Sequence, residues 1–555
     1  MKGFEFYAEL IRHQKVDHCF GLLGDANMQF ASKLADLGVE FTYVQHEHCA
    51  IAASMAYARK TGKIGISTVT CGPGLTQIMT ALPAAVRAGI PLIILAGESP
   101  LNKSWYNQQI DQAPFVKATG AQYFAIHTTA RFKEGINEAF LTAVRDSIPV
   151  VVGVPFDLFH QNVTAPETQA GPALWEQCQI NKRGPAPCKE DLDSIVSALK
   201  SAKRPIILAG LGANDKKTAL LIEELSEKAD ALLTTTLPAR GLFNTNPFYL
   251  GISGGFSSEI TRKKLANSDL ILSIGASLTS HNTDQGTLWP QARVIQVTMN
   301  PQYFYQGRSV AHQIICADAH QTVLKLLNTM ETKPVHNRTE STREEIAISE
   351  PDSSASQKYN DGLNPSVAAK HLNRGIPNDW QLVNSSGHCS YYFSHMKNRP
   401  YPKFLTIREF GAIGNGLSFA MGVAVATREP TVLFDGDGSF LMHVQELETI
   451  RRDKLPIISC IFNDGGYGSE FHKLRSEGLR EDGANFGFTN LARIADGFNI
   501  ENYQINTIEE LDQALESLVR APQAAVLDIR ISQKAISPVI QRSHGVHSKT
   551  TKLQT

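Results

Sequence analysis

The chain alternates short apolar runs of strand length with longer stretches of helical periodicity. In the first part, the runs at 17–23, 40–45, 65–70, 91–98 and 149–155 are apolar throughout, and 47–62 and 74–89 repeat apolar residues at helical spacing. Strands that are apolar on both faces are buried on both sides, and helices between them cover the faces of a parallel sheet. This part predicts an α/β domain with a doubly wound parallel sheet. Residues 1–20 predict an amphipathic helix rather than a signal peptide.

The same alternation returns twice. Apolar runs recur at 203–214, 231–240, 268–279 and 293–300, and again at 379–387, 402–409, 430–438, 455–465 and 523–531. We therefore predict three doubly wound parallel-sheet domains, at 1–160, 190–328 and 362–535, in a chain too long for one ordinary domain. The polar stretches 161–189 and 329–361 are predicted to be linkers, the second one aperiodic and mobile. Three similar blocks also indicate a duplicated architecture, without a clean repeat of residues.

Composition narrows the possible partners. Hydrophobic residues make up 42% of the chain, and 53 Lys and Arg nearly balance 54 Asp and Glu. A formal net charge of −1 gives no reason to expect a nucleic acid or an acidic membrane surface as partner. The eight cysteines are scattered without CxxC pairs, which predicts a reduced, cytoplasmic setting and no structural zinc. No apolar run approaches the ~18–20 residues that span a bilayer, so we expect a soluble intracellular protein.

Polar turn residues follow two neighbouring strands of the third block. The residues are Gly436, Asp437, Gly438 and Ser439 after the first strand, and Asp464, Gly466 and Tyr467 after the second. The carboxyl ends of parallel strands meet at one edge of a sheet, so we expect these side chains to lie together. Glycine-rich backbone before a helix suits phosphate, and carboxylates suit Mg²⁺. Each motif alone is more typical of an ordinary turn; the pair predicts a magnesium and phosphate site.

This pair, "GDGSF" followed by "FNDGGYG", resembles the thiamine diphosphate signature. The resemblance extends over the whole chain to the superfamily of acetohydroxyacid (acetolactate) synthases and of pyruvate and benzoylformate decarboxylases. It implies that the first block binds the aminopyrimidine and the third binds diphosphate and Mg²⁺. Asp437, Asp464 and the Gly466 carbonyl are the implied metal ligands, although many relatives have Asn where this chain has Asp464. The residues implied to contact the cofactor here are Gly436, Gly438, Ser439 and Tyr467.

A second part of the resemblance lies in the first block. Residues 43–63 are similar to the family's "RHEQGA…GYARATGK", which places Glu47 where a protonated carboxyl bonds N1′ of the aminopyrimidine. The resemblance implies that this bond activates the cofactor to attack a 2-oxo acid, and burial would keep the carboxyl neutral. A lone Glu is more often a surface helix residue, but the surrounding match favours catalysis. His46 and His48 flank Glu47, and successive helix positions point apart, so we expect at most one to reach the site.

Other segments are similar to cofactor contacts of the family. The resemblance places Ile413 as the wedge between the two cofactor rings and the Gly411 carbonyl beside the amino group; helix packing is the alternative for Gly414, Gly416 and Gly422. Three residues after a predicted strand are implied to contact the diphosphate: Ser386, Gly387 and His388. Pro73 and Gln108 lie in segments similar to the family's TSGPGATN and FQExD. For these two, an ordinary helix start and an ordinary loop remain equal alternatives.

The sequence leaves the reaction after loss of CO₂ open. Asp25 and Glu470 stand where simple decarboxylases carry acids, which favours release of an aldehyde. The loop 101–112 lacks the paired histidines of pyruvate decarboxylases and resembles carboligases instead. We predict an acetolactate synthase-like carboligation, with aldehyde-releasing decarboxylation as the alternative. FAD is a further candidate, because 251–256 and 273–284 lie where flavin-binding relatives contact it, although the Arg-containing FDDR-type segment is missing.

Two rival classes are less compatible with the sequence. A nicotinamide dehydrogenase would carry GxGxxG after a strand, and none occurs. A non-catalytic paralogue would have no need for Glu47, Ile413, Asp437 and Asp464 together. The resemblance also implies that the two halves of the site meet between subunits, in a homodimer at minimum and commonly a homotetramer. The substrate and the placement of residues 535–555 are not predicted.

Overall fold

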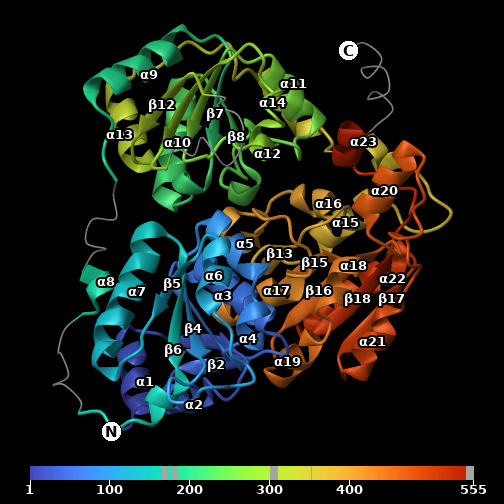
Figure 1. Ribbon diagram of the computed structural model, residues 1–555. Coiled ribbons are helices and arrows are strands. Elements are labelled where there is room, and N and C mark those ends of the chain that lie inside the picture. Colours follow the sequence, from blue (N-terminus) through green and yellow to red (C-terminus); the bar gives the residue numbers. More distant parts are fainter. Residues whose placement is uncertain (165–171, 178–183, 301–310, 352, 545–555) are drawn as a thin grey trace.

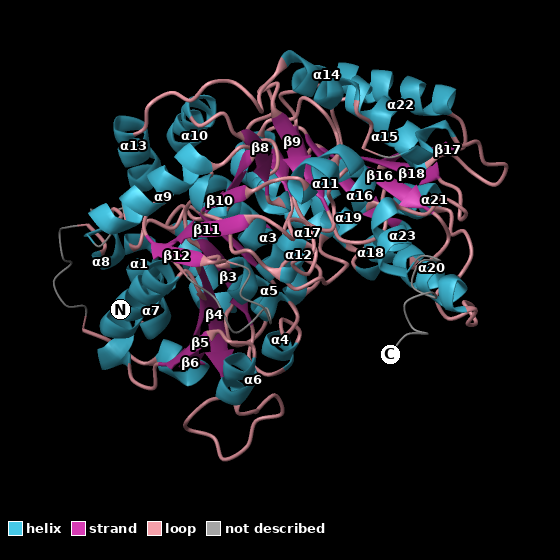
Figure 2. Ribbon diagram, turned by 90° about the horizontal axis from the view of Figure 1, so that it is seen from above, coloured by secondary structure: helices cyan, strands magenta, loops and turns pink. Residues whose placement is uncertain are grey.

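The structure is a computed structural model that describes residues 1–164, 172–177, 184–300, 311–351 and 353–544 (Figure 1). It contains three six-stranded sheets, and every strand pair in them is parallel. Helices cover both faces of the sheets; Figure 2 shows α15 and α22 above the third sheet and α17 and α18 below it. The predicted fold class is therefore confirmed.

The first sheet has the strand order β2-β1-β3-β4-β6-β5. Its strands are β1 (His18–Gly21), β2 (Glu40–Tyr43), β3 (Gly65–Val69), β4 (Leu92–Glu98), β5 (Gln122–Ala125) and β6 (Pro149–Pro155). Its helices are α1 (Gly3–His13), α2 (Met28–Asp36), α3 (Glu47–Thr61), α4 (Pro73–Thr76), α5 (Ala81–Ala88), α6 (Gln112–Ala118) and α7 (Phe132–Asp146), and the short α8 (Leu174–Gln177) follows. The single helix expected over 74–89 is thus divided into α4 and α5.

The central sheet has a different order, β12-β11-β10-β7-β8-β9. Its strands are β7 (Pro205–Ala209), β8 (Leu232–Thr235), β9 (Tyr249–Ile252), β10 (Leu270–Ile274), β11 (Arg293–Thr298) and β12 (Gln313–Cys316). Its helices are α9 (Lys189–Ser201), α10 (Lys216–Lys228), α11 (Glu259–Ala266), α12 (Ser280–Thr283) and α13 (Ala319–Thr329).

The third sheet repeats the topology of the first, in the order β14-β13-β15-β16-β18-β17. Its strands are β13 (Gln381–Asn384), β14 (Phe404–Leu405), β15 (Thr431–Gly436), β16 (Ile457–Asn463), β17 (Glu501–Ile505) and β18 (Ala525–Arg530). Its helices are α15 (Pro365–Gly375), α16 (Ser390–Ser394), α17 (Gly416–Thr427), α18 (Asp437–Met442), α19 (Glu446–Arg452), α20 (Gly468–Glu477), α21 (Leu491–Gly497), α22 (Ile508–Arg520) and α23 (Pro538–His544). The duplication expected from the sequence thus holds for the topology of the outer two sheets.

The segment 329–361 is not the aperiodic, mobile linker that its composition predicted. It contains helix α14 (Glu340–Ile348). The Asp230 carboxylate accepts hydrogen bonds from three successive backbone N–H groups, those of residues 336–338, and Glu345 forms ion pairs with Lys263 and Lys264 at 2.7 and 2.6 Å. The part at 336–345 therefore packs on the central domain, whereas Glu350 and Pro351 contact the third domain. The segment's Ser, Thr and Glu residues serve as helix caps and ion-pair partners, which composition alone does not distinguish from a tether.

The first and third domains share one hydrophobic core, built around helices α3 and α17. Both helices are buried along most of their length, and small residues let them approach closely. A Cβ atom on Gly422 would overlap the Ala53 carbonyl, and one on Gly416 would overlap the Asp435 carboxylate. The packing alternative for these two glycines is therefore confirmed.

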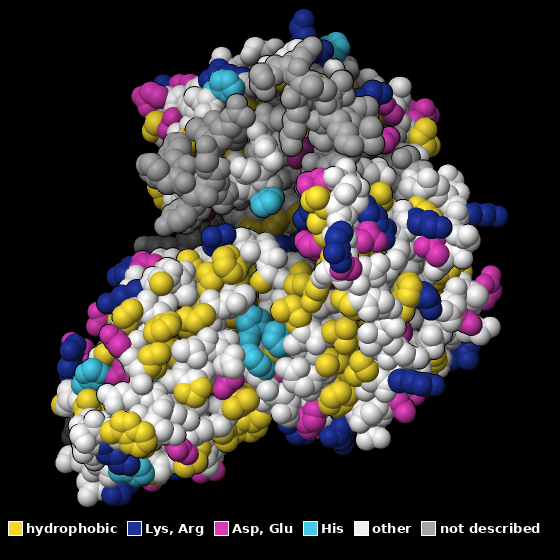
Figure 3. All heavy atoms as spheres, turned by 45° about the vertical axis from the view of Figure 1, so that its right-hand side comes forward, with side chains coloured by type: hydrophobic (Ala, Val, Ile, Leu, Met, Phe, Trp, Pro, Cys, Tyr) yellow, Lys and Arg dark blue, Asp and Glu magenta, His cyan; other side chains and the backbone are white. Residues whose placement is uncertain are grey.

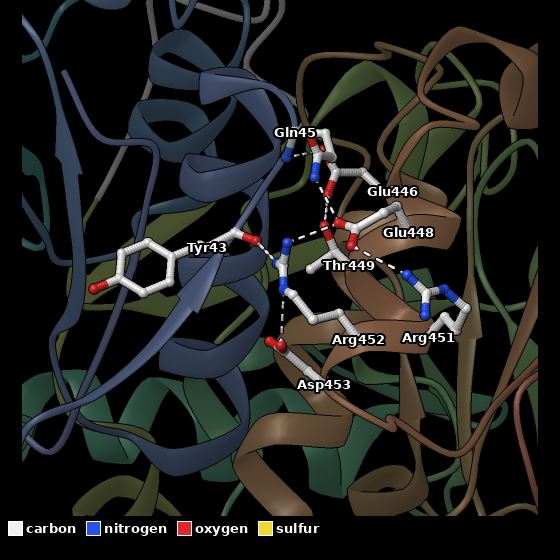
Figure 4. Close-up of polar contacts among 8 residues, drawn as sticks. All are labelled: Tyr43, Gln45, Glu446, Glu448, Thr449, Arg451, Arg452 and Asp453. Carbon is white, nitrogen blue, oxygen red and sulfur yellow. Dashed lines mark hydrogen bonds and ion pairs between the residues drawn. The ribbon is translucent and has the colours of Figure 1, made fainter. Parts of the chain in front are cut away.

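Polar contacts flank this helix pair at the boundary between the two domains (Figure 4). The Gln45 backbone N–H donates to Glu446 Oε1 at 3.0 Å, and its side-chain amide donates to Glu448 at 2.5 Å. The Arg452 guanidinium donates to the Tyr43 carbonyl and, at 2.7 Å, to Glu448. These contacts fix the residues that lead into α3 against the third domain.

No helix among the described residues is long and apolar enough to cross a membrane. The seven cysteines that the described part of the chain contains are all free.

Candidate functional site

The predicted metal residues lie at the carboxyl edge of the third sheet, where β15 and β16 are neighbours. β15 ends at Gly436, and Asp437 begins the short helix α18. A Cβ atom on Gly438 would lie 2.8 Å from the Tyr467 ring and 3.5 Å from the Gly466 carbonyl oxygen. The two predicted turns therefore pack against each other.

Asp437 and Asp464 form a buried pair of carboxyl groups, with 1% and 5% of their surfaces exposed. Burial raises the pKa of both, and the charge of Asp464 raises the pKa of Asp437 further. Asp437 Oδ2 is buried and has no hydrogen-bond partner among the described residues. Two neighbouring buried carboxylates stay ionised only when a cation compensates them, so this pair fits a divalent ion.

The described residues hold no group of three His, Cys, Asp or Glu side chains that could bind a metal by themselves. Mg²⁺ usually takes one or two carboxylates and completes its shell with water and phosphate oxygens. Asp437, Asp464 and the Gly466 carbonyl could therefore hold Mg²⁺ with water and the oxygens of a phosphate-bearing molecule completing its shell.

Asp435 is a site residue that the sequence analysis missed. It is fully buried, and burial raises its pKa to about 7. The Ser439 hydroxyl donates to Asp435 at 3.0 Å and accepts from the Gly414 backbone N–H at 2.9 Å. The hydroxyl thus ties loop 411–415 to Asp435, which leaves the backbone N–H of Ser439, rather than its hydroxyl, for a phosphate. The signal in the sequence that could have revealed Asp435 is an acidic residue near the end of a buried strand.

The loop after β13 lies beside the same pair of carboxyl groups. It carries Ser386, Gly387 with φ +124°, and His388. His388 Nε2 accepts from the Ser537 backbone N–H at 3.0 Å, so its proton is on Nδ1, which lies 3.8 Å from Asp464 Oδ2. Gln533 donates to the Asp464 carbonyl at 2.5 Å. The described part of the C-terminal segment therefore packs on the metal loop; residues 545–555 lie outside the described residues.

Glu470 is exposed on α20 and forms an ion pair with Lys473 at 3.4 Å. Burial lowers the pKa of His388 to about 4, and the nearby charge of Glu470 opposes this shift. Glu470 therefore lies close to His388, beside the metal loop.

Glu47 begins α3 at the carboxyl end of the first sheet. It is partly buried, its Oε1 lies near Gly74, and burial raises its pKa, which is the direction that a protonated carboxyl requires. His46 Nδ1 accepts from the His48 backbone N–H, and His48 Nε2 lies 2.5 Å from Asn415 Oδ1. The His46 and His48 rings both lie near His443, with centroids 5.2 and 4.9 Å away.

Both histidines beside Glu47 therefore turn toward the third domain, whereas we expected at most one to reach the site. His46 lies in the extended N-cap position rather than within the helix, so the helical rule for neighbouring side chains does not apply to it. Figure 3 shows histidine side chains gathered on the surface between the two lower domains.

Asp25, Pro73 and Gln108 come together near Glu47. Pro73 begins α4 after Gly72, whose φ of +61° and contact with the Gln108 carbonyl leave no room for a side chain. Gln108 Oε1 lies 3.5 Å from the Cys71 thiol and 3.4 Å from the Tyr106 hydroxyl. The same hydroxyl lies 3.3 Å from Asp25 Oδ2. The sequence analysis missed Tyr106, because nothing in its local pattern distinguishes it from other loop residues.

Loop 411–415 connects the two halves of the site. Gly411, with φ +73°, borders open space, and Ile413 is partly exposed. Asn415 contacts His48 in the first domain, and Gly414 contacts Ser439 at the metal edge. No hydrogen bond between described residues joins Glu47 directly to Asp437 or Asp464 within one chain. The Ile413 side chain is thus partly exposed between the polar residues of the first domain and those of the metal edge.

Comparisons with known proteins agree with this arrangement. Three family descriptions match successive parts of the chain: "Thiamine pyrophosphate enzyme, N-terminal TPP binding domain" at residues 1–115, the central domain at 192–326, and the C-terminal TPP binding domain at 385–529. The chain is 25% identical over 550 residues to the acetolactate synthase isozyme 2 large subunit of Escherichia coli (strain K12), covering 96% of each chain.

Two further relatives are equally similar, and one of them has a different name. An acetolactate synthase of Arthrospira platensis is 25% identical over 94% of this chain and 93% of its own length. A sulfoacetaldehyde acetyltransferase of Roseovarius nubinhibens is 25% identical over 96% of this chain and 93% of its own length. The matched domains, in the same order as the three sheets, show that the chain belongs to the thiamine pyrophosphate (thiamine diphosphate) enzyme family.

Proposed function

We propose that this chain is a thiamine diphosphate- and Mg²⁺-dependent enzyme that decarboxylates a 2-oxo acid such as pyruvate and transfers the remaining acyl unit to an acceptor carbonyl, as an acetolactate synthase-like carboligase. The observation that carries the proposal is the buried pair Asp437 and Asp464 beside the Gly466 carbonyl, which needs a cation and a phosphate to complete it. When bound, thiamine diphosphate supplies a carbon nucleophile and an electron sink for the loss of CO₂.

Different residues of this chain would bind the metal, the diphosphate and the two rings of the cofactor. Asp437, Asp464 and Gly466 would hold Mg²⁺, and the backbone N–H groups at the start of α18 would hold the diphosphate. Glu47, whose pKa burial raises, would keep a proton for the aminopyrimidine. Ile413 would fill the space between the two rings.

Aldehyde-releasing decarboxylation is the second candidate. It is favoured by Asp25, which is held by the Tyr106 hydroxyl, and by Glu470 near the metal loop, since both could transfer protons. The proposal includes no flavin. At the switch point between β7 and β10, where a dinucleotide pyrophosphate would bind, the Gly212 N–H donates to the Gly275 carbonyl at 2.9 Å, and the Gly210 N–H donates to Ile274. These two amides are therefore already bonded and not free to bind the pyrophosphate of FAD.

We further propose that the chain forms at least a homodimer and assembles into a homotetramer. Each site would then be completed between two subunits. Large apolar side chains are exposed around both halves: Leu23, Met28, Leu101, Trp105 and Ile110 in the first domain, and Phe410, Met442, Tyr467, Phe486 and Phe488 in the third. Such side chains on two faces are typical of protein interfaces. A cytoplasmic location belongs to the same proposal, because the described cysteines are free thiols.

To test this proposal, the purified protein is incubated with thiamine diphosphate, Mg²⁺ and each of a panel of 2-oxo acids. CO₂ release is followed, and the products are identified with and without an added aldehyde. Carboligation predicts a hydroxyketone or hydroxy-oxo acid, whereas the second candidate predicts a free aldehyde. Absence of CO₂ release that depends on the cofactor and the metal would refute both.

A further inference from the structure

Four side chains meet at one end of the candidate site in the first domain. Asp25 follows β1, Cys71 follows β3, and Tyr106 and Gln108 lie in the loop after β4. β3 pairs with both β1 and β4, so these side chains occupy adjoining positions at the carboxyl edge of the sheet. The Tyr106 hydroxyl lies between Asp25 and Gln108, at 3.3 and 3.4 Å.

This cluster borders Glu47 through the short segment that follows β3. Gly74 in that segment lies next to Glu47 Oε1, and Thr70 packs against Gly24, the neighbour of Asp25. The Ala26 backbone N–H also points to Thr70 Oγ1, at 3.4 Å. The cluster is therefore part of the edge that carries the proposed catalytic acid.

The cluster carries negative charge without a basic partner. Among the described residues in hydrogen-bond or ring contact with these four side chains, none is Lys or Arg. Burial raises the pKa of the Cys71 thiol, and the charges of Asp25 and Glu98 raise it further. Burial, together with nearby negative groups, raises the pKa of Tyr106 to about 12, so Tyr106 is a neutral donor.

We propose that Asp25, positioned by Tyr106, makes this end of the site accept a neutral carbonyl compound, an aldehyde, in preference to an anionic 2-oxo acid. The inference rests on the proposed carboligation and names its acceptor. The 2-oxo acid loses CO₂, its acyl carbon bonds to the aldehyde carbon, and the aldehyde oxygen takes a proton from solvent, giving a 2-hydroxyketone. A second 2-oxo acid would bring its carboxylate toward Asp25, and like charges repel.

The test is a competition between two acceptors. The enzyme with thiamine diphosphate and Mg²⁺ receives pyruvate as donor and, at the same concentration, acetaldehyde, and the ratio of acetoin to acetolactate is measured. Wild type should form mainly acetoin. Asp25→Asn should lower this ratio between about threefold and thirtyfold, the range for one charge at site distances. Tyr106→Phe, which keeps the charge but frees the carboxylate, should lower it less.

Asp111→Asn is the matched control, because it removes the same charge from the loop that carries Tyr106 and Gln108, without contacting the cluster. It should leave the ratio within about twofold, below any effect expected for a charge in direct contact. A wild-type preference for pyruvate as acceptor would overturn the inference. So would an unchanged ratio in Asp25→Asn, or equal changes in both Asp→Asn variants.

A binding measurement separates this inference from the proposed function. Acetamide and acetate, equal in size but different in charge, are titrated into the same protein at constant ionic strength. Fluorescence of Trp105, which is exposed beside Tyr106, reports binding. Acetamide should change the fluorescence at a lower concentration than acetate does. In Asp25→Asn, the difference between these two concentrations should be smaller. If the protein prefers acetamide but releases no CO₂, only the proposed function is refuted. If it releases CO₂ but binds the two ligands equally, only this inference is refuted.

Discussion

Gly422 is the point at which the contact between the first and third domains can be tested most directly. In Gly422→Ala, the new methyl group would overlap the Ala53 carbonyl oxygen and lie 2.9 Å from the carbonyl carbon and from the Ala56 Cβ. Real Cβ atoms do not approach backbone so closely, and neither helix can yield locally because both are buried. α3 and α17 must therefore move apart. Overpacking of this kind costs about 1–3 kcal/mol.

The movement should also affect the site. α3 begins at Glu47, and α17 begins just after Asn415, whose Oδ1 lies 2.5 Å from His48. Separation of the helices stretches this contact and shifts Glu47 relative to loop 411–415. Because a misplacement of about 1 Å can cost a hundredfold in rate, we expect kcat to fall by at least tenfold.

Thermal unfolding at a fixed scan rate measures the first effect. For domains of this size, 1–3 kcal/mol corresponds to a loss of about 2–12 °C in Tm. Gly497→Ala is the control, because that glycine lies in helix α21 with nothing within 4 Å of its Cβ position; it should leave Tm unchanged or slightly higher. If Gly422→Ala has the wild-type Tm and kcat, the close crossing of α3 and α17 is wrong.

Four further predictions follow from the site. Glu47→Gln should bind thiamine diphosphate like wild type but lose most turnover, and a wild-type rate would remove its assigned role. Asp437→Ala should lose most of the thermal stabilisation by thiamine diphosphate with Mg²⁺, which is about 2.7 kcal/mol at a hundredfold excess over Kd; unaltered stabilisation would contradict the metal assignment. Burial lowers the pKa of His48 to about 4, so the unfolded chain binds its proton from about pH 6.5 downward and the folded chain does not. Wild-type stability should therefore fall by up to about 3 kcal/mol between pH 6.5 and 4, and His48→Gln should flatten that slope in acid-unfolding curves. Mixed and reassembled Glu47→Gln and Asp437→Ala subunits should regain about a quarter of wild-type activity if sites lie between subunits, and none if each chain is self-sufficient.

The inner strands could be predicted from the sequence, whereas four of the six edge strands could not. β4, β6 and β16 are buried at nearly every position, so their sequences are apolar throughout. The four strands that were missed, β5, β9, β12 and β17, all lie at the edge of a sheet. They are short, and most of their positions are exposed or half-exposed; β5 has no buried position at all. An edge strand has a neighbouring strand on one side only, so fewer apolar residues are needed to keep it in the sheet.

The site shows a similar division between local and distant information. Asp437, Asp464 and Glu47 directly follow strands or begin helices, so their placement at a sheet edge depends on a few neighbouring residues. Their partners come from far along the chain: Gln533 holds the carbonyl of Asp464, and Asn415 holds His48. Such pairs depend on how whole domains pack, and periodicity carries no information about that. Tyr106 was missed for this reason, since only the fold brings Asp25 to it.

The repeated topology explains how one chain can provide two different halves of a site. In both outer sheets the strand order reverses between the first and third strands, which opens a crevice at the carboxyl edge. In the first sheet, Asp25 and the segment 70–74 border this position; in the third, His388 and Asp437 do. The same position thus adjoins Glu47, whose pKa burial raises, in one domain and a buried pair of carboxyl groups that fits a cation in the other. Because α3 and α17 hold the two domains of one chain in a common core, neither crevice can move independently. A coenzyme with a basic ring at one end and a diphosphate at the other matches these two kinds of edge, one from each of two subunits in the proposed dimer.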